Sequence, residues 1–204
     1  MRRIPLSRRS HVTGFGTASG AVVPHESALE RDFVLCVSFL DAGAVITSQP
    51  VTISFSHDDR QRRYTPDFHV RWSDGRGELV EIKYRVDLRA DWARLRPAFA
   101  AAIEFAKACS ERFRITTERG IRDVLLDNAR RLLPLRRAPL DVAMAEAARA
   151  IVCRLRAPTL NEAVAAMPCD RVTALGVMLR LMARGDLVFD LREAVGLDTR
   201  LRLS

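Results

Sequence analysis

The sequence predicts a mixed α/β domain followed by a smaller, mostly helical domain. Apolar residues at helical spacing come before and after a stretch in which apolar and polar residues alternate, as they do in strands. The expected order in the first domain is helix, three strands, helix, strand. The chain has 204 residues, of which 48% are hydrophobic and 28% charged. That composition excludes wholesale disorder, and the length predicts one or two domains.

The first helix is expected to begin after Ser27, a residue type that caps helix N-termini. It should end before Gly43, and its apolar stripe consists of Leu29, Phe33, Cys36, Val37 and Leu40. The preceding residues 1–24 contain four arginines, no acids and a run rich in Gly, Ser and Thr. We interpret them as a basic, flexible arm.

Strand-like alternation runs from Val51 to Phe55, and a polar turn over 56–61 leads into a second run over 63–72. Another turn, over 73–77, precedes a third run over 78–84. Successive side chains of a strand point to opposite faces. Glu81 and Lys83 therefore share one face of the third strand.

A second helix is expected around Trp92 to Ala106, with Pro97 near its first turn or at a kink, and a short strand covers Phe113 to Ile115. Prolines and arginines then interrupt any periodic pattern. We place a linker over 131–139, between a domain over 25–130 and a second domain over 140–204.

The second domain shows three helical patterns, over 140–156, 159–167 and 170–184, and then a β-pair of 187–191 with 201–203. This is the order of a winged helix-turn-helix. In the third helix we expect an apolar core stripe and an outward face: Val172, Leu175, Leu179 and Met182 inward, and Arg171, Thr173 and Arg180 outward.

The net charge of +8 favours a polyanionic partner, nucleic acid before an acidic membrane. Only two of the 33 basic residues are lysines, Lys83 and Lys107. From residue 138 onward 9 arginines face 8 acids, so residues 1–137 carry +7 of the charge. We therefore expect the second domain to contact protein, or DNA weakly, rather than to read a DNA sequence.

Cysteines at 36, 109, 153 and 169 lack the spacing of a zinc or redox motif. No stretch approaches the roughly 18 apolar residues that a membrane span needs, and the N-terminus has no apolar signal segment. We expect a soluble, intracellular protein with no membrane partner.

The residues that carry chemistry are Asp67, which follows Pro66, and the pair Glu81 and Lys83. They form a PD-(D/E)xK pattern. Two carboxylates from neighbouring strands can hold a hard cation such as Mg²⁺, which offsets phosphate charge and lowers the pKa of a bound water. The lysine can orient or help deprotonate that water. The alternative is a set of exposed charges on an edge strand, but the chain places one of its two lysines here.

Glu30 is a further candidate, with two interpretations. Ser27 and Glu30 have the spacing of a capping box, in which Glu30 would return to the helix terminus. Alternatively, Glu30 reaches the same metal cluster. Glu26 competes with it for either role, and the spacing does not separate these interpretations.

Four segments, 25–33, 49–51, 64–68 and 78–84, carry a family resemblance. Together with the helix around Trp92, they make about residues 10–128 resemble the N-terminal nuclease domain of TnsA-type transposase endonuclease subunits. The resemblance implies a restriction-endonuclease-like fold and cleavage of DNA at the 5′ ends of a transposon. It implies Mg²⁺ as the cofactor, with Mn²⁺ as an alternative.

The resemblance also implies DNA, a DDE-type transposase subunit that cuts and joins the 3′ ends, and an ATPase regulator of transposition as partners, in the bacterial cytoplasm. Matching positions put the family's helix glutamate on Glu30, its metal aspartate on Asp67 and its lysine on Lys83. Some members carry glutamine at the position of Glu81, whose carboxylate nevertheless suits a metal.

Contacts to DNA are expected from Arg62, Arg63, Arg85 and His69, each of which can also be an ordinary surface residue. His69 lies two residues after Asp67 and thus on the same strand face. Two other functions fit the same sequence. One is a restriction or junction-resolving nuclease with this core, and the other is a non-catalytic DNA-binding regulator that uses the winged domain.

Overall fold

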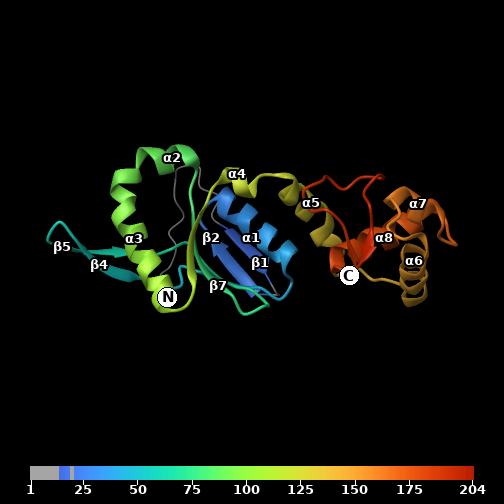
Figure 1. Ribbon diagram of the computed structural model, residues 1–204, viewed down its shortest axis with the longest axis horizontal. Coiled ribbons are helices and arrows are strands. Elements are labelled where there is room, and N and C mark those ends of the chain that lie inside the picture. Colours follow the sequence, from blue (N-terminus) through green and yellow to red (C-terminus); the bar gives the residue numbers. More distant parts are fainter. Residues whose placement is uncertain (1–13, 19–20) are drawn as a thin grey trace. The chain divides into compact units, whose positions relative to one another are not determined.

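The computed structural model describes residues 14–18 and 21–204. The chain divides into two compact units, the first ending at Arg122 and the second beginning at Asp123 (Figure 1). The division thus precedes the predicted linker over 131–139, and helix α5 (Val124–Leu132) belongs to the second unit. Asp123 begins that helix, because its side chain accepts a hydrogen bond from the backbone N–H of Leu125.

The first unit is built on a four-stranded mixed sheet in the order β3-β6-β7-β8. Its strands are β3 (Val45–Ser48), β6 (Phe68–Arg71), β7 (Gly77–Ile82) and β8 (Arg112–Thr116). β6 is antiparallel to β3 and β7, and β8 is parallel to β7. A parallel pair needs a crossover, and here α2 (Arg85–Ala90) and α3 (Trp92–Ala108) supply it.

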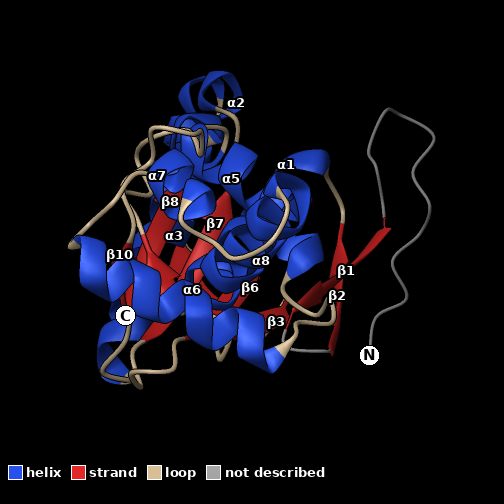
Figure 2. Ribbon diagram, turned by 90° about the vertical axis from the view of Figure 1, so that its right-hand side faces the viewer, coloured by secondary structure: helices blue, strands red, loops and turns tan. Residues whose placement is uncertain are grey.

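Helices α1 and α3 cover opposite faces of this sheet (Figures 1 and 2). α1 (Ala28–Leu40) packs Phe33 on Phe68, with ring centroids 5.6 Å apart. α3 packs Ala102 and Ala106 against Leu79 of β7. Alternation along β7 therefore sends Val80 and Ile82 toward α1, and Leu79 and Glu81 toward α3. The short helix α4 (Glu118–Ile121) closes the unit.

The middle strands differ from the prediction. The run over 63–72, expected to be one strand, is divided at Thr65-Pro66-Asp67, because proline has no backbone N–H to donate to a ladder. Its first part ends β5 (Arg60–Tyr64), which pairs only with β4 (Ile53–His57) as a separate ribbon, and its second part is β6. Strand β3, only four residues long, was not predicted.

Within the predicted flexible arm over 1–24, the described residues 14–18 and 21–24 lie in two strands. β1 (Gly14–Ala18) pairs antiparallel with β2 (Ala21–His25). Gly14 and Gly16 therefore lie in a strand, which the composition alone did not distinguish from an arm. Residues 1–13 lie outside the described part of the chain.

The second unit has the predicted order of three helices and a β-pair. After α5 and the 3₁₀ turn η1 (Leu133–Leu135) come α6 (Val142–Leu155), α7 (Leu160–Ala165) and α8 (Arg171–Arg184), then β9 (Leu187–Val188) and β10 (Arg202–Leu203). β9 and β10 are antiparallel. Its assignment as a winged helix stays a prediction.

The predicted core stripe of α8 was wrong in part. Val172, placed inside, is 82% exposed, whereas the buried residues are Ala174, Val177, Met178, Leu181, Met182 and Ala183. The Asp170 cap, which accepts from the N–H groups of Val172 and Thr173, sets where the helix starts. The helix packs on the face of Ala174 and Val177, two residues along from the predicted stripe.

Candidate active site

Asp67 and Glu81 meet because β6 and β7 are neighbours. The register pairs Phe68 with Val80, which places the preceding Asp67 opposite Glu81. The backbone N–H of Ile82 donates to Oδ2 of Asp67 at 2.7 Å and fixes that side chain. The alternation predicted Asp67 within the second strand of the hairpin, but the residue lies just before β6.

Lys83 completes this cluster from the end of β7. Its Nζ lies 3.0 Å from Oε1 of Glu81. The Glu81 side chain is 4% exposed and that of Lys83 is 34% exposed, so the lysine connects a buried carboxylate to solvent. The backbone N–H of Lys83 donates to the carbonyl of Thr116 at 3.1 Å, so β8 holds this residue in place.

The electrostatics show that the charges interact closely. Burial, and next the negative charge of Glu81, raise the pKa of Asp67 to about 8, against the opposing effect of Lys83. Burial lowers the pKa of Lys83, but the charges of Glu81 and Asp67 outweigh it, and the pKa is raised above its ordinary value. Such perturbed groups in contact with one another are a recurrent property of functional sites.

Tyr64 belongs to the same cluster and was not predicted. Its hydroxyl donates to Oε2 of Glu81 at 2.6 Å, so the two carboxylate oxygens of Glu81 are held by Tyr64 and Lys83. Burial, and then the charge of Glu81, raise the pKa of Tyr64, which keeps its proton as a donor. Its ring packs edge-on against Phe99 and Phe113. Tyr64 stands three residues before Asp67, at the end of β5. The contact with Glu81 depends on the separate β4–β5 ribbon, which the alternation of apolar and polar residues did not predict.

Glu30 makes the capping contacts that the sequence suggested. Its backbone N–H donates to Oγ of Ser27 at 3.1 Å, and its carboxylate accepts from that hydroxyl at 2.9 Å and from the N–H of Glu26 at 2.7 Å. Burial raises the pKa of Glu30, against these hydrogen bonds, and the charge of Lys83 also acts on it. Glu30 therefore caps α1 and lies close enough to Lys83 for the positive charge of that lysine to act on its carboxylate.

Glu26 does not compete for the metal position in this arrangement. Its Oε1 accepts a hydrogen bond at 2.9 Å from the side-chain amide of Gln49. The backbone N–H of Gln49 donates in turn to the carbonyl of Asp67 at 2.8 Å. Glu26 and Gln49 thus tie the start of α1 to the segment that carries Asp67.

The donor set fits a hard cation held by two carboxylates. Mg²⁺ takes oxygen ligands, keeps several waters and is commonly bound through one or two carboxylates. Asp67 and Glu81 supply them. Burial and then the charge of Glu81 raise the pKa of Asp67, and a cation beside both carboxylates would oppose these two effects. Among residues 14–18 and 21–204, no three His, Cys, Asp or Glu side chains form a metal-holding group. The Glu30 carboxylate is bonded at its own helix terminus, so its place in a trio with Asp67 and Glu81 stays a prediction.

The predicted DNA contacts fall in three places. Arg62 and Arg63 are exposed on β5, and Arg85 begins α2, where its backbone N–H donates to Oε2 of Glu118 at 2.9 Å. His69 lies on the Asp67 face of β6, but its Nε2 is 2.9 Å from Oε1 of Glu111. That ion-pair partner favours the structural interpretation of His69.

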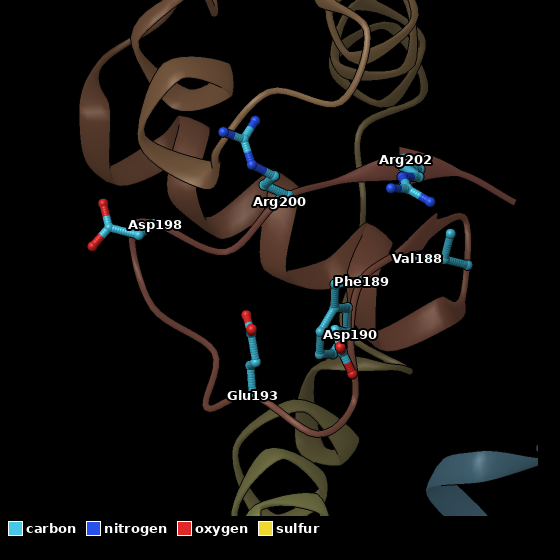
Figure 3. Close-up of a pocket in the computed structure, with 7 residues that line it drawn as sticks. All are labelled: Val188, Phe189, Asp190, Glu193, Asp198, Arg200 and Arg202. Atoms are coloured by element: carbon cyan, nitrogen blue, oxygen red, sulfur yellow. The ribbon is translucent and has the colours of Figure 1, made fainter.

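The second unit contains a cavity of about 480 Å³ that none of these residues lines. Figure 3 shows its wall, which comes from β9, β10 and the segment between them: Val188, Phe189, Asp190, Glu193, Asp198, Arg200 and Arg202. Three carboxylates face two guanidinium groups there, so the lining carries one negative charge in excess. The cavity contains none of the predicted catalytic residues.

Residues 44–118 match a family described as TnsA-like endonuclease N terminal. A search of curated proteins finds no match. None of the helices in the described residues is long and apolar enough to cross a membrane. The match covers less than the resemblance seen in the sequence and leaves Glu30 outside, but it includes Asp67, Glu81 and Lys83. The mixed sheet with helices on both faces is the restriction-endonuclease-like fold. Residues 44–118 are therefore similar to the TnsA-like endonuclease N-terminal domains.

Proposed function

We propose that this protein is a metal-dependent DNA endonuclease, the subunit of a heteromeric cut-and-paste transposase that cleaves phosphodiester bonds at the 5′ ends of the transposon. The observation that carries the proposal is the meeting of Asp67, Glu81 and Lys83 at the ends of adjacent strands, within the segment that matches the TnsA-like family.

Each residue has a distinct part in this reaction. Asp67 and Glu81 would hold Mg²⁺, which supplies Lewis acidity and lowers the pKa of a bound water when present. Lys83 orients the attacking water and places a positive charge where the pentavalent phosphate develops. Tyr64 holds Glu81 in position through its hydroxyl. Glu30 adds a third negative charge at the start of α1.

Cleavage of end-labelled transposon-end DNA, with Mg²⁺ and the partner DDE-type transposase, tests this proposal. Wild type should cut the 5′ strand, and Asp67→Ala and Lys83→Ala should not, while both variants keep wild-type melting curves. Lys107→Ala is a matched control, because it removes the only other lysine, which is exposed and pairs with Glu104 on α3. Undiminished cutting by Asp67→Ala or Lys83→Ala would show that these residues are not catalytic.

The same assay without the partner separates this function from a restriction or junction-resolving nuclease. A transposase subunit should be nearly inactive alone, whereas a stand-alone nuclease should cut a defined DNA by itself. The ATPase regulator and the contacts of the second unit belong to the proposal only through the family resemblance.

A further inference from the structure

Apart from Tyr64, the β4–β5 ribbon has no part in the proposed chemistry. It forms a two-stranded sheet of its own and projects past α3 (Figure 1). An isolated hairpin is marginally stable in water, so it needs an anchor. Ile53 supplies one within the core of Leu79, Ala102 and Ala106, and Tyr64 supplies the other through its bond to Glu81.

The two faces of the ribbon differ in chemistry. Residues directly opposite each other share a face, and the register pairs Ile53 with Tyr64 and Ser54 with Arg63. Ile53 and Tyr64 face α3, since Ile53 packs on its alanines and Tyr64 on Phe99. The other face, which we call the open face, consists of Ser54, Ser56, Gln61 and Arg63.

All four side chains of the open face are exposed, and none is apolar. The amide of Gln61 donates to Oγ of Ser56 at 2.7 Å, which ties the two strands together across this face. At the base of the ribbon, the hydroxyls of Thr52 and Thr65 are 2.9 Å apart, and Thr65 stands two residues before Asp67. Thr52 and Thr65 thus continue the polar open face to the base of the ribbon, next to the segment that carries Asp67.

Arg62 and Arg63, neighbours in β5, differ in their pairing with acids. Arg62, on the α3 side, lies 3.9 Å from Oδ2 of Asp58, which also contacts His57 at 3.3 Å. Arg63, on the open face, makes no ion pair with any residue in 14–18 or 21–204. Its guanidinium group is therefore available to an external anion.

We propose that the open face binds the sugar-phosphate backbone of double-stranded DNA beside the bond that is cut. This proposal rests on the proposed nuclease function. Arg, Ser, Thr and Gln are the side chains that commonly contact phosphate and sugar oxygens. A protein partner is disfavoured, because protein interfaces have an apolar or aromatic centre and this face has none. A two-stranded ribbon is also narrow enough to enter the major groove.

Binding of the full chain to a mixed-sequence DNA duplex, followed by fluorescence anisotropy in EDTA over a range of salt concentrations, tests the ribbon. The slope of log K against log salt is negative, and each lost phosphate contact makes it less steep by about 1. Arg63→Ala should therefore show a salt dependence that is less steep by this amount. Gln61→Ala should weaken binding by about 2- to 10-fold through a lost hydrogen bond, with little change in slope.

Arg60→Ala is the matched control, because it removes the same charge from an exposed position of the same strand on the other face. It should keep the wild-type slope. Equal slopes for Arg63→Ala and Arg60→Ala, or no duplex binding by wild type, would overturn the assignment of the open face.

Failure of this inference differs from failure of the nuclease function. If wild type cuts DNA with Mg²⁺ and its partner while the two arginine variants bind alike, the ribbon proposal is wrong and the nuclease stands. If binding depends on Arg63 but wild type cuts nothing, the ribbon binds DNA and the proposed activity is wrong.

Discussion

Replacing Tyr64 with phenylalanine removes one oxygen atom, the donor that holds Oε2 of Glu81 at 2.6 Å. The ring should remain in place, because its edge-on contacts with Phe99 and Phe113 do not involve the hydroxyl. Glu81 is only 3% exposed, so water cannot readily replace the lost donor. The variant therefore isolates one hydrogen bond to a buried carboxylate.

The expected cost follows from the nature of that bond. A hydrogen bond to a charged group contributes about 2 kcal/mol, and an unsatisfied buried acceptor loses a similar amount. For a chain of this length, about 2 kcal/mol lowers the melting temperature by about 4–8 °C. Because Glu81 would then be held only by Lys83, cleavage should fall by about 10- to 100-fold, as for groups that orient a metal ligand.

Two assays check this prediction, thermal unfolding by circular dichroism and single-turnover cleavage in the presence of the partner transposase. Tyr84→Phe is the control, since the chain has only two tyrosines and Tyr84 contacts Arg122 instead of Glu81. Binding of Mn²⁺, followed by calorimetry, reports on Glu81 independently of turnover. If Tyr64→Phe melts, binds Mn²⁺ and cleaves like wild type, Tyr64 does not position Glu81.

Three further predictions follow from the first unit. Ser27→Ala should lose about 1 kcal/mol of stability, because a helix cap is removed, and should cleave DNA like wild type. Glu30→Gln should keep the wild-type melting temperature and cleave about 100-fold more slowly. If the two variants change stability and cleavage alike, Glu30 only caps the helix. Arg122→Leu should destabilise by about 2 kcal/mol in urea unfolding, because the buried Asp32 loses its ion pair of 2.9 Å with Arg122 and keeps that of 3.3 Å with Arg31; an unchanged midpoint would contradict this. Burial opposes ionisation of Asp41, but bonds from backbone amides outweigh it and hold its pKa below 3.8. Its stabilisation is complete above pH 3.8 and is lost as the pH falls through the lowered folded value, so wild type and Asp41→Asn should converge in stability only in acid, and parallel curves would refute the assignment.

Local patterns predicted much of the fold. The stripe from Leu29 and the Ser27 cap predicted where α1 starts and, within two residues, where it ends. Three helices with a β-pair were found in the second unit where periodicity placed them. Short strands were harder, because four residues such as Val45–Ser48 carry too little alternation to stand out. The division at Pro66 was missed because alternation on either side looked continuous.

The sequence by itself determined which residue types could carry the chemistry, since an aspartate after proline, a Glu-x-Lys pair and a rare lysine are visible without a fold. Strand periodicity also put Glu81 and Lys83 on one face. Contacts between distant segments were decided only by the tertiary structure. Strand pairing places Asp67 against Glu81, the ribbon brings Tyr64 to the same carboxylate, and the helix terminus holds Glu30. Periodicity describes a single element, whereas such contacts depend on which elements become neighbours and in what register.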